Sequence, residues 1–438
     1  MGFTRSLVER ALSIRFEAIP PAALHVAKTT LLDTMGVALA GSDERVARAV
    51  RALVASEVRE GPASIWGTTE RASAARAALA NGTAAHALDY DDVCWAMNAH
   101  PSAVLWPTAL AVGEAQSASG AAALVAYVAG FEAAADLGSI LGNEHYAAGF
   151  HPTVTIGTIA ATITAGKLLE LGDVELRRAV GIASSRVSGT RLNFGTDTKP
   201  LHAGLAAEAG IMAASLAKLG VTACENAIEG PMGIAALYRG ESTGSPRSGY
   251  ALIDPGVELK PYPSCRFTHR IIDAALAIRA RHPTKNAASI ECTVDPFSPS
   301  VVIYSRPTTG LEAKFSMEYA AAVALLDGGV GVDAFTDARV AKDDVQRLLR
   351  QVTVTKGSGS GSAKVETLRV RFSDGAADEE SVHVAKGSPS KPLSRAELAN
   401  KFRMTATGVL GARTAAVEDA VERFESLSNV GILGALLR

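Results

Sequence analysis

The feature that most constrains the fold is a run of alanine-rich helical segments over residues 5 to about 250. Within 21–40, for example, Leu24, Leu31 and Met35 recur at helical spacing. Several later stretches carry few charged residues, and a helix without a polar face is buried. The expected helices span 45–57, 71–87, 103–117, 121–141, 154–170, 174–187, 202–219 and 223–228. We therefore expect a large core of closely packed helices.

The character of the sequence changes after about residue 258. Short, alternating, β-branched segments predict strands over 291–295, 351–355, 367–372 and 380–385. Further helices are expected over 267–281, 315–326, 341–350, 395–404 and 413–425. The predicted fold class is therefore mainly α. A large all-helical domain spans 1–259 with 395–438, and a smaller α+β domain spans 260–394.

Charge and composition restrict the kind of partner. The chain has 43 Lys and Arg against 45 Asp and Glu, for a net charge of −2, so we expect no nucleic-acid partner, which would require a basic face. The four cysteines form no CxxC pair and indicate reduced thiols. The N-terminal residues lack the apolar core of a signal peptide. Pro107, Glu114 and Glu132 interrupt the apolar stretch 103–137, so we predict a cytoplasmic protein with no membrane span.

Four polar segments stand out from this alanine-rich background. Most of them pair ionisable residues with Gly or Pro, which favour bends where side chains can converge. Acids, imidazoles and lysines without a metal-ligand pattern indicate proton transfer on a small anionic carboxylate substrate. The segments are His86–Asp92 with His100 just after, Gly149–Thr153, Asn193–Gly204 and Lys260–His269.

In their joint order and spacing these segments resemble the MmgE/PrpD family, which includes 2-methylcitrate dehydratase, cis-aconitate decarboxylase and iminodisuccinate epimerase. The turn at Glu229, the block from Ala313 and the segment from Lys386 also match. The resemblance implies a helical domain with a smaller α+β lid domain, a homodimer, and chemistry without a cofactor in the cleft between the domains. Because the family carries out several reactions, the resemblance does not fix the reaction.

Three residues are predicted to move protons. His151, in a turn before Pro152, would by itself be a turn histidine bonded to the backbone. The matching family histidine lies in the active site, and an imidazole can exchange a proton near neutral pH. Asp89 and His100 also match family active-site positions.

A metal site is the alternative for the acidic residues around Asp89. Asp89, Asp91 and Asp92 fall within four residues, and carboxylates that face each other raise at least one pKa, which suits a general acid. No calcium loop follows and the histidines lack zinc spacing, so no metal ligand is expected.

The remaining predicted site residues are cationic or can donate a hydrogen bond. Lys199 precedes Pro200 and is expected at a helix entry, where an anion binds well. Lys199 and Lys260 are predicted to bind the substrate carboxylates and to stabilise the carbanion. The predicted substrate contacts are Arg191, His202, His269, Tyr304 and Arg306. A buried helix position bonded to a carbonyl is the alternative for His202.

The predicted activity is cofactor-independent proton transfer at a carbon next to a carboxylate of a di- or tricarboxylate. The residues of the second and third segments, Gly149–Thr153 and Asn193–Gly204, resemble most closely the epimerase-like branch of the family, which favours an epimerase-like reaction. The alternatives are a 2-methylcitrate-type dehydratase and a cis-aconitate-type decarboxylase. Val93 stands where decarboxylases of the family carry Thr, which disfavours the decarboxylase. The apolar loop from Val93 to Ala99 indicates a different substrate shape. A non-catalytic polycarboxylate-binding protein is a third class, which would not need Asp89, His100 and His151.

Overall fold

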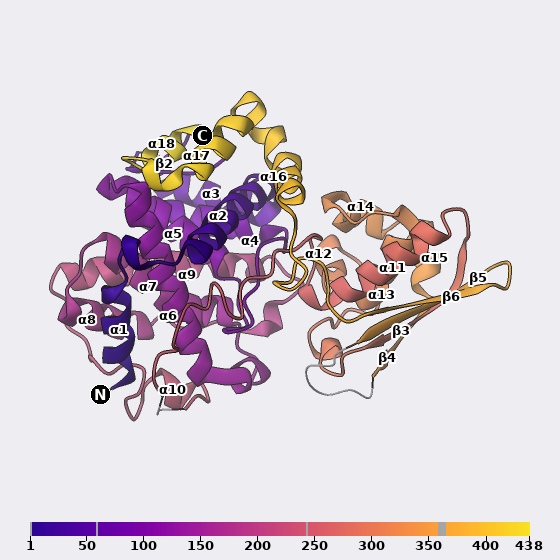
Figure 1. Ribbon diagram of the computed structural model, residues 1–438, viewed down its shortest axis with the longest axis horizontal. Helices are drawn as coiled ribbons and strands as arrows, with labels where there is room; N and C mark the ends of the chain where they lie inside the picture. The colour runs from indigo at the N-terminus through magenta and orange to yellow at the C-terminus, as the bar shows by residue number, and fades with distance from the viewer. Residues whose placement is uncertain (1, 58–59, 242–243, 358–364) are drawn as a thin grey trace. The chain divides into compact units, whose positions relative to one another are not determined.

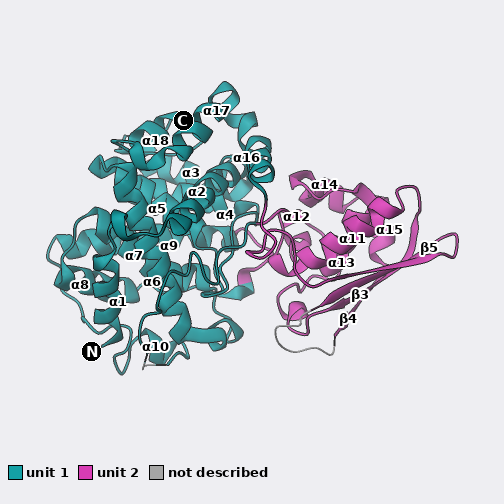
Figure 2. Cartoon of the chain, in the orientation of Figure 1, with its two compact units in different colours: residues 1–192, 198–259, 394–438 teal, residues 193–197, 260–393 magenta. Residues whose placement is uncertain are grey.

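The computed structural model describes residues 2–57, 60–241, 244–357 and 365–438. These residues form two compact units, shown in different colours in Figure 2. Unit 1 consists of Met1–Leu192, Thr198–Leu259 and Ser394–Arg438, and unit 2 of Asn193–Asp197 and Lys260–Leu393. The division departs from the expected domains at 193–197, which belong to unit 2, and at Ser394, which belongs to unit 1.

Unit 1 is built mainly from helices (Figure 1). Its α-helices are α1 (Phe3–Ser13), α2 (Pro21–Gly41), α3 (Arg45–Glu57), α4 (Ala74–Ala87), α5 (Ser102–Gln116), α6 (Gly120–Ala147), α7 (Pro152–Leu168), α8 (Asp173–Ser184), α9 (Thr198–Lys218), α10 (Ile234–Leu237), α16 (Arg395–Leu410), α17 (Thr414–Glu422) and α18 (Gly431–Leu436). Most of these helices lie where the apolar periodicity predicts them.

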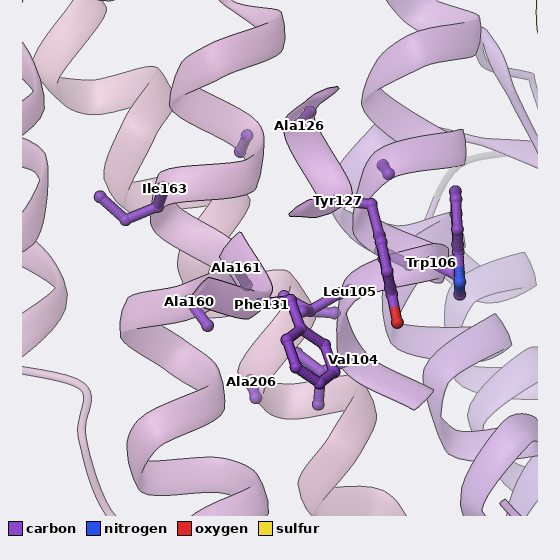
Figure 3. Packing of buried hydrophobic residues seen from close by; sticks show 14 of the residues in the cluster. Val104, Leu105, Trp106, Ala126, Tyr127, Phe131, Ala160, Ala161, Ile163 and Ala206 are labelled. Atoms are coloured by element: carbon purple, nitrogen blue, oxygen red, sulfur yellow. The ribbon is translucent and has the colours of Figure 1, made fainter. Parts of the chain in front are cut away.

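Small residues let the central helices pack closely. A Cβ added to Gly210 of α9 would lie 2.4 Å from the Cβ of Ala161 in α7, so only glycine fits there. Figure 3 shows small alanines and larger side chains such as Phe131 together in this core. Trp106 of α5 stacks on Tyr127 of α6 with 4.0 Å between ring centroids. The core therefore forms from helices that are apolar on nearly all sides, as the low charge of these segments predicts.

Two details of unit 1 correct the expected elements. The helix predicted over 71–87 begins only at Ala74, because β2 (Arg71–Ala72) pairs antiparallel with β1 (Ala63–Ser64). Unit 1 is thus not entirely helical. The segment 223–228 forms turns rather than a helix. That segment is too short to stabilise a helix by itself.

Among the described residues, α6 is long and apolar enough to cross a membrane. However, 89% of its apolar window is buried inside the structure. A core helix of a globular unit has this character, because its apolar residues contact other helices rather than lipid.

Unit 2 combines a four-stranded sheet with helices. The strands are β3 (Ala287–Val294), β4 (Val352–Lys356), β5 (Glu366–Phe372) and β6 (Ala377–Val382), in the order β4-β3-β5-β6. β3 is parallel to β4, and the other two pairs are antiparallel. The helices are α11 (His269–Arg281), α12 (Gly310–Ala313), α13 (Met317–Asp327), α14 (Asp337–Val340) and α15 (Asp343–Leu349). The fold is therefore mainly α with a smaller α+β part.

Candidate active site

The first polar segment begins at the C-terminal end of α4. Asp89 has a left-handed φ of 51°, a conformation that Asp adopts more readily than most residues. Its N–H donates to the carbonyl oxygen of His86 over 3.2 Å, which ends the helix. His86, Asp89 and the following Tyr90 to Asp92 are all buried. The turn therefore leaves three carboxyl groups and an imidazole in the interior of unit 1.

Lys199 reaches this segment from the first turn of α9. It is the second residue of that helix, as the Lys-Pro pair predicts. Its Nζ lies 3.0 Å from Asp89 Oδ1 and 3.1 Å from His86 Nε2. The side chains of Lys199 and Asp89 are each 4% exposed, so the ion pair is shielded from water. A buried charge is tolerated when it is paired and hydrogen-bonded in this way.

The imidazole of His86 links Lys199 to a second carboxylate. Because an ammonium only donates, Nε2 of His86 accepts from Lys199, and Nδ1 carries the proton and donates to Asp91 Oδ2 over 2.7 Å. Burial lowers the pKa of His86, Asp91 opposes that effect, and Lys199 lowers the pKa further. His86 is therefore a neutral connector between Lys199 and Asp91. His86 lies in the first polar segment, but the sequence does not predict it as a site residue.

His100 lies on the other side of the same carboxylate. Its Nδ1 is 2.9 Å from the carbonyl oxygen of Asp92 and 3.4 Å from Asp91 Oδ2, which places the proton on Nδ1. The side chain of His100 is 15% exposed. The ring centroids of His86 and His100 are 4.6 Å apart, so the segment gathers two imidazoles around Asp91.

His151 is the N-cap residue of α7, with Pro152 at the first helical position. This is the bend that the sequence predicts, but the side chain is buried rather than exposed, at 1% of its surface. Its ring centroid lies 5.9 Å from that of His86 and 6.4 Å from that of His100. Burial, with the nearby Lys199 charge, lowers the pKa of His151 well below its usual value. The ring is therefore neutral at physiological pH.

His202 contacts His151 directly. The two Nδ1 atoms are 2.9 Å apart. Burial lowers the pKa of His202 to about 4. The alternative weighed for His202, a bond to a carbonyl, is replaced by this imidazole–imidazole hydrogen bond. The unit 1 residues Asp89, His100, His151, Lys199 and His202 are thus all part of one buried cluster.

Asp92 has a different role from its neighbours. It accepts from the Ser102 amide over 3.1 Å and from the Ser102 hydroxyl over 2.6 Å. Ser102 Oγ lies 2.8 Å from Tyr127 Oη, which continues the chain toward the core. Burial raises the pKa of Asp92 to about 7, the Ser102 bonds oppose the shift, and Asp91 adds to it. One of the close carboxyls is therefore a weak acid, as expected, although burial is the larger cause.

A buried ion pair between Lys401 and Asp33 holds the main chain of the first polar segment at Tyr90. Lys401 of α16 lies 2.7 Å from Asp33 Oδ1 of α2 and donates to the Tyr90 carbonyl over 2.9 Å. Its Nζ is also 3.9 Å from the centroid of the Tyr90 ring. The sequence reading missed both Asp33 and Lys401. The available signal for Asp33 was a carboxylate within an apolar helix.

Arg191 is placed beside the His151 turn rather than in the cluster. Its guanidinium lies 4.0 Å from the centroid of the Tyr146 ring and donates to the Tyr146 carbonyl over 3.0 Å. Its amide donates to Gly149 O over 2.8 Å. These contacts brace the turn that precedes α7. A substrate contact by Arg191 stays a prediction.

The other predicted residues belong to unit 2. Lys260 is fully buried. His269 lies 2.9 Å from Arg266 through Nδ1 and 3.2 Å from the Ser264 carbonyl through Nε2. Their assignment to substrate stays a prediction.

Tyr304 and Arg306 bond to main-chain carbonyls of unit 2. Tyr304 donates to the Phe194 carbonyl over 2.8 Å, which ties residues 193–197 to this unit. Arg306 donates to the carbonyls of Ser305 and Leu349 over 2.9 and 3.0 Å. The substrate contacts predicted for these two residues remain predictions.

Two sets of residues in the described chain have ligand atoms close enough for a metal ion. One is His86, His100 and His151, and the other is His86, Asp89, Asp91 and His100, with ligand atoms within 4.8 Å of one another. In the second set, Lys199 already supplies the cation for Asp89 and occupies Nε2 of His86. The donor geometry therefore fits a lysine–carboxylate–imidazole network better than a metal centre.

The glycines of segment 357–362 do not match a phosphate-binding loop, because no Lys-Ser/Thr follows in frame. Most of this segment lies outside the described residues.

Together, the fold and the site define a mainly α protein with a buried acid–base cluster in its helical unit. Family models match both parts of the chain, the MmgE/PrpD N-terminal domain over residues 5–245 and the MmgE/PrpD C-terminal domain over residues 262–426. The chain therefore belongs to the MmgE/PrpD family, which confirms the resemblance of its motifs.

Similar proteins include three that carry the name cis-aconitate decarboxylase. That of Mus musculus is 31% identical over 433 residues, covering 94% of this chain and 88% of the relative. That of Homo sapiens is 30% identical over 443 residues, covering 94% and 89%. That of Aspergillus terreus is 24% identical over 472 residues, covering 100% and 96%. The similarity thus extends over both units.

Proposed function

We propose that this protein is a cofactor-independent lyase that removes CO2 from a small unsaturated di- or tricarboxylate. The observation that carries the proposal is the placement of Lys199 between Asp89 and His86, beside the neutral imidazole of His151. Relatives named as decarboxylases, similar over nearly the whole chain, support this choice among the family's reactions. These relatives favour decarboxylation over the epimerase-like reaction that the second and third polar segments indicate.

Loss of CO2 leaves an electron pair on carbon, and the site must stabilise that charge. A carboxylate next to the carbon delocalises the pair, and an ammonium group held in place stabilises it. Lys199 is such a group, because two hydrogen bonds to Asp89 and His86 fix its Nζ in a buried environment. Charge interactions are stronger there than in water.

The carbon must then take up a proton. Besides His86, the cluster contains three imidazoles: His100, whose Nδ1 bonds to the Asp92 carbonyl, and His151 and His202, which bond to each other through Nδ1. His151 is assigned as the donor, and His100, with Asp89, as the group on the opposite side of the substrate. An imidazole suits this step because it gives and regains a proton readily near neutral pH.

The choice of acid substrate depends in part on Val93. Its amide and carbonyl pair with Glu258 over 2.9 and 2.8 Å, and its side chain is buried. A valine cannot supply the hydroxyl that Thr would supply at this position. Without that hydroxyl, the site cannot prefer a substrate that accepts a hydrogen bond there over one that does not. The relatives' names support an acid related to cis-aconitate, and the absence of the hydroxyl favours one that does not need that hydrogen bond. Cis-aconitate itself is the first acid to test.

Dehydration and epimerisation remain the alternatives, because both can start from a similar carbanion. The test is a panel of citrate-, aconitate-, succinate- and aspartate-derived acids incubated with the protein in D2O and followed by NMR. The proposal expects CO2 release with one deuterium in the new C–H bond. Deuterium exchange without loss of CO2 would instead identify an epimerase, and release of water a dehydratase. Binding in a thermal-shift screen, with no exchange or turnover, would identify a binding protein.

A further inference from the structure

Lys199 and His202 lie about one helical turn apart at the start of α9. Residues at this spacing share one face of a helix. Lys199 reaches Asp89, and His202 reaches His151. The start of α9 therefore supplies a partner to two predicted catalytic groups. His202 does so through a single hydrogen bond between ring nitrogens.

That hydrogen bond couples the protonation of the two rings. One Nδ1 must donate and the other must accept, and burial keeps both rings neutral. If His202 donates, His151 must carry its own proton on Nε2. If His151 donates, its Nε2 is a bare acceptor. Only the first arrangement gives His151 a proton to deliver from the ring edge opposite His202.

The backbone around His202 restricts its ring. Gly189 has a left-handed φ of 122°, and a Cβ there would lie 3.5 Å from His202 Nε2 and 2.3 Å from a Val154 methyl group. The Gly189 carbonyl accepts the amide of His151 over 3.1 Å, so one residue contacts both members of the pair. His202 is 4% exposed and His151 1%, so both residues of the pair are buried.

We propose that His202 is a positioning residue that holds His151 in the tautomer with its proton on Nε2 and replaces that proton during turnover. The inference rests on the function proposed above. His202 then acts through His151, because its Nδ1 is bonded to the His151 ring.

The proton accounting supports this role. When the C–C bond breaks, the electron pair stays on carbon and takes the proton from His151 Nε2, while CO2 leaves. His151 would become an imidazolate, a very unfavourable anion, unless Nδ1 gains a proton at the same time. The Nδ1–H of His202 supplies it, and water protonates His202 Nε2. After product release, water protonates His151 Nε2, the Nδ1 proton of His151 returns to His202 Nδ1, and water removes the proton from His202 Nε2, which restores the starting tautomers. Each CO2 released consumes one solvent proton.

The direct test measures the tautomer of His151 in the wild-type protein, by NMR of imidazole-15N-labelled protein. The proposal expects a protonated Nε2 and an unprotonated Nδ1. The opposite tautomer would overturn it. This readout needs no substrate and no variant. It therefore still decides whether His202 fixes the His151 tautomer if the protein proves not to be a decarboxylase, so the two failures are distinguishable.

Two variants add the kinetic test. His202→Phe removes the donor and retains an aromatic ring, and His202→Asn places an amide N–H near the position of Nδ1. We expect kcat of His202→Phe to fall about 100-fold with KM within about threefold, because general acid catalysis is lost and binding is not. His202→Asn should hold the His151 tautomer and recover part of kcat. Unchanged kcat in a folded His202→Phe, or an unchanged His151 tautomer in that variant, would refute the role.

Discussion

The two units use their polar side chains differently. In unit 1, Lys199, Asp89 and His86 bond to one another in a buried network. In unit 2, Tyr304 and Arg306 donate to main-chain carbonyls of their own unit. Main-chain bonds of this kind stabilise loops. A buried side-chain network has a large desolvation cost and is often found where a protein carries out chemistry. The comparison supports the proposal that the buried network of unit 1 carries out the chemistry.

The largest effect is expected from Lys199→Met. Without the ammonium, the charge that develops on carbon is no longer stabilised, and kcat should fall about 1,000-fold. Steady-state decarboxylation kinetics on the folded variant measure this loss. Arg306→Gln is the control from unit 2 and should stay within about twofold. A folded Lys199→Met variant within tenfold of wild type would break the comparison, and a large loss in Arg306→Gln would restore its predicted substrate contact.

A large stability effect is expected from Lys401→Met. The substitution leaves the Asp33 carboxylate buried without its ion-pair partner and removes the bond to Tyr90 O. Breaking a buried pair in this way costs about 3–5 kcal/mol of unfolding free energy. Urea unfolding measures it. The matched control in the same helix is Arg395→Met, whose ion pair with Glu422 is exposed and is worth less than about 1 kcal/mol. Equal losses in the two variants would contradict the account.

Asp92 predicts a pH-dependent difference in stability. Its folded-state pKa of about 7 lies above that of an unfolded Asp, so the folded state binds the extra proton. The stabilisation is fully present below about pH 4 and is lost as the pH rises toward 7. Asp92→Asn, a neutral isostere, should therefore gain stability relative to wild type over that range, by a few kcal/mol.

Unfolding titrations of wild type and Asp92→Asn at pH 4 to 7 give this difference. Taking the difference cancels the opposite trend from the buried histidines, whose lowered pKa values make stability rise with pH. A constant difference between the two proteins would show that Asp92 ionises normally.

The smallest effect is expected from Tyr304→Phe. The variant loses only the hydrogen bond from Tyr304 Oη to the Phe194 carbonyl, which is worth about 1 kcal/mol. If Tyr304 has only this bracing role, kcat should stay within about threefold. Thermal unfolding and kinetics on the same preparation test both statements. A loss of activity without a loss of stability would return Tyr304 to the substrate contacts predicted from sequence.

Much of the fold could be predicted because helix periodicity is a local signal. The apolar spacing of 21–40 and the Ser394–Glu397 capping box place α2 and the start of α16 closely. The polar segments of unit 1 were also visible, since they interrupt a background with few charges. Local periodicity failed at 223–228, where a few apolar residues in turns resembled a helix.

The partners within the site could not be predicted, because they depend on contacts between distant residues. Lys401 and Tyr90 are 311 positions apart, and no local pattern relates them. The burial of His151 could not be predicted for the same reason. The bend next to Pro152 is visible in the local sequence, but the helices that cover His151 are distant in sequence. The sequence reading could name Lys199 and Asp89, but not that each is the other's ion-pair partner.

The most direct test of the central claim is the rate at which a His151→Gln variant places deuterium from D2O in the product, measured by NMR beside wild type. Our account expects wild type to release CO2 from cis-aconitate or a related acid with one deuterium per product. The variant, folded as judged by its thermal unfolding, should be slower by about 100-fold or more. A folded variant that incorporates deuterium at the wild-type rate would contradict the claim that the buried cluster of unit 1 delivers the proton.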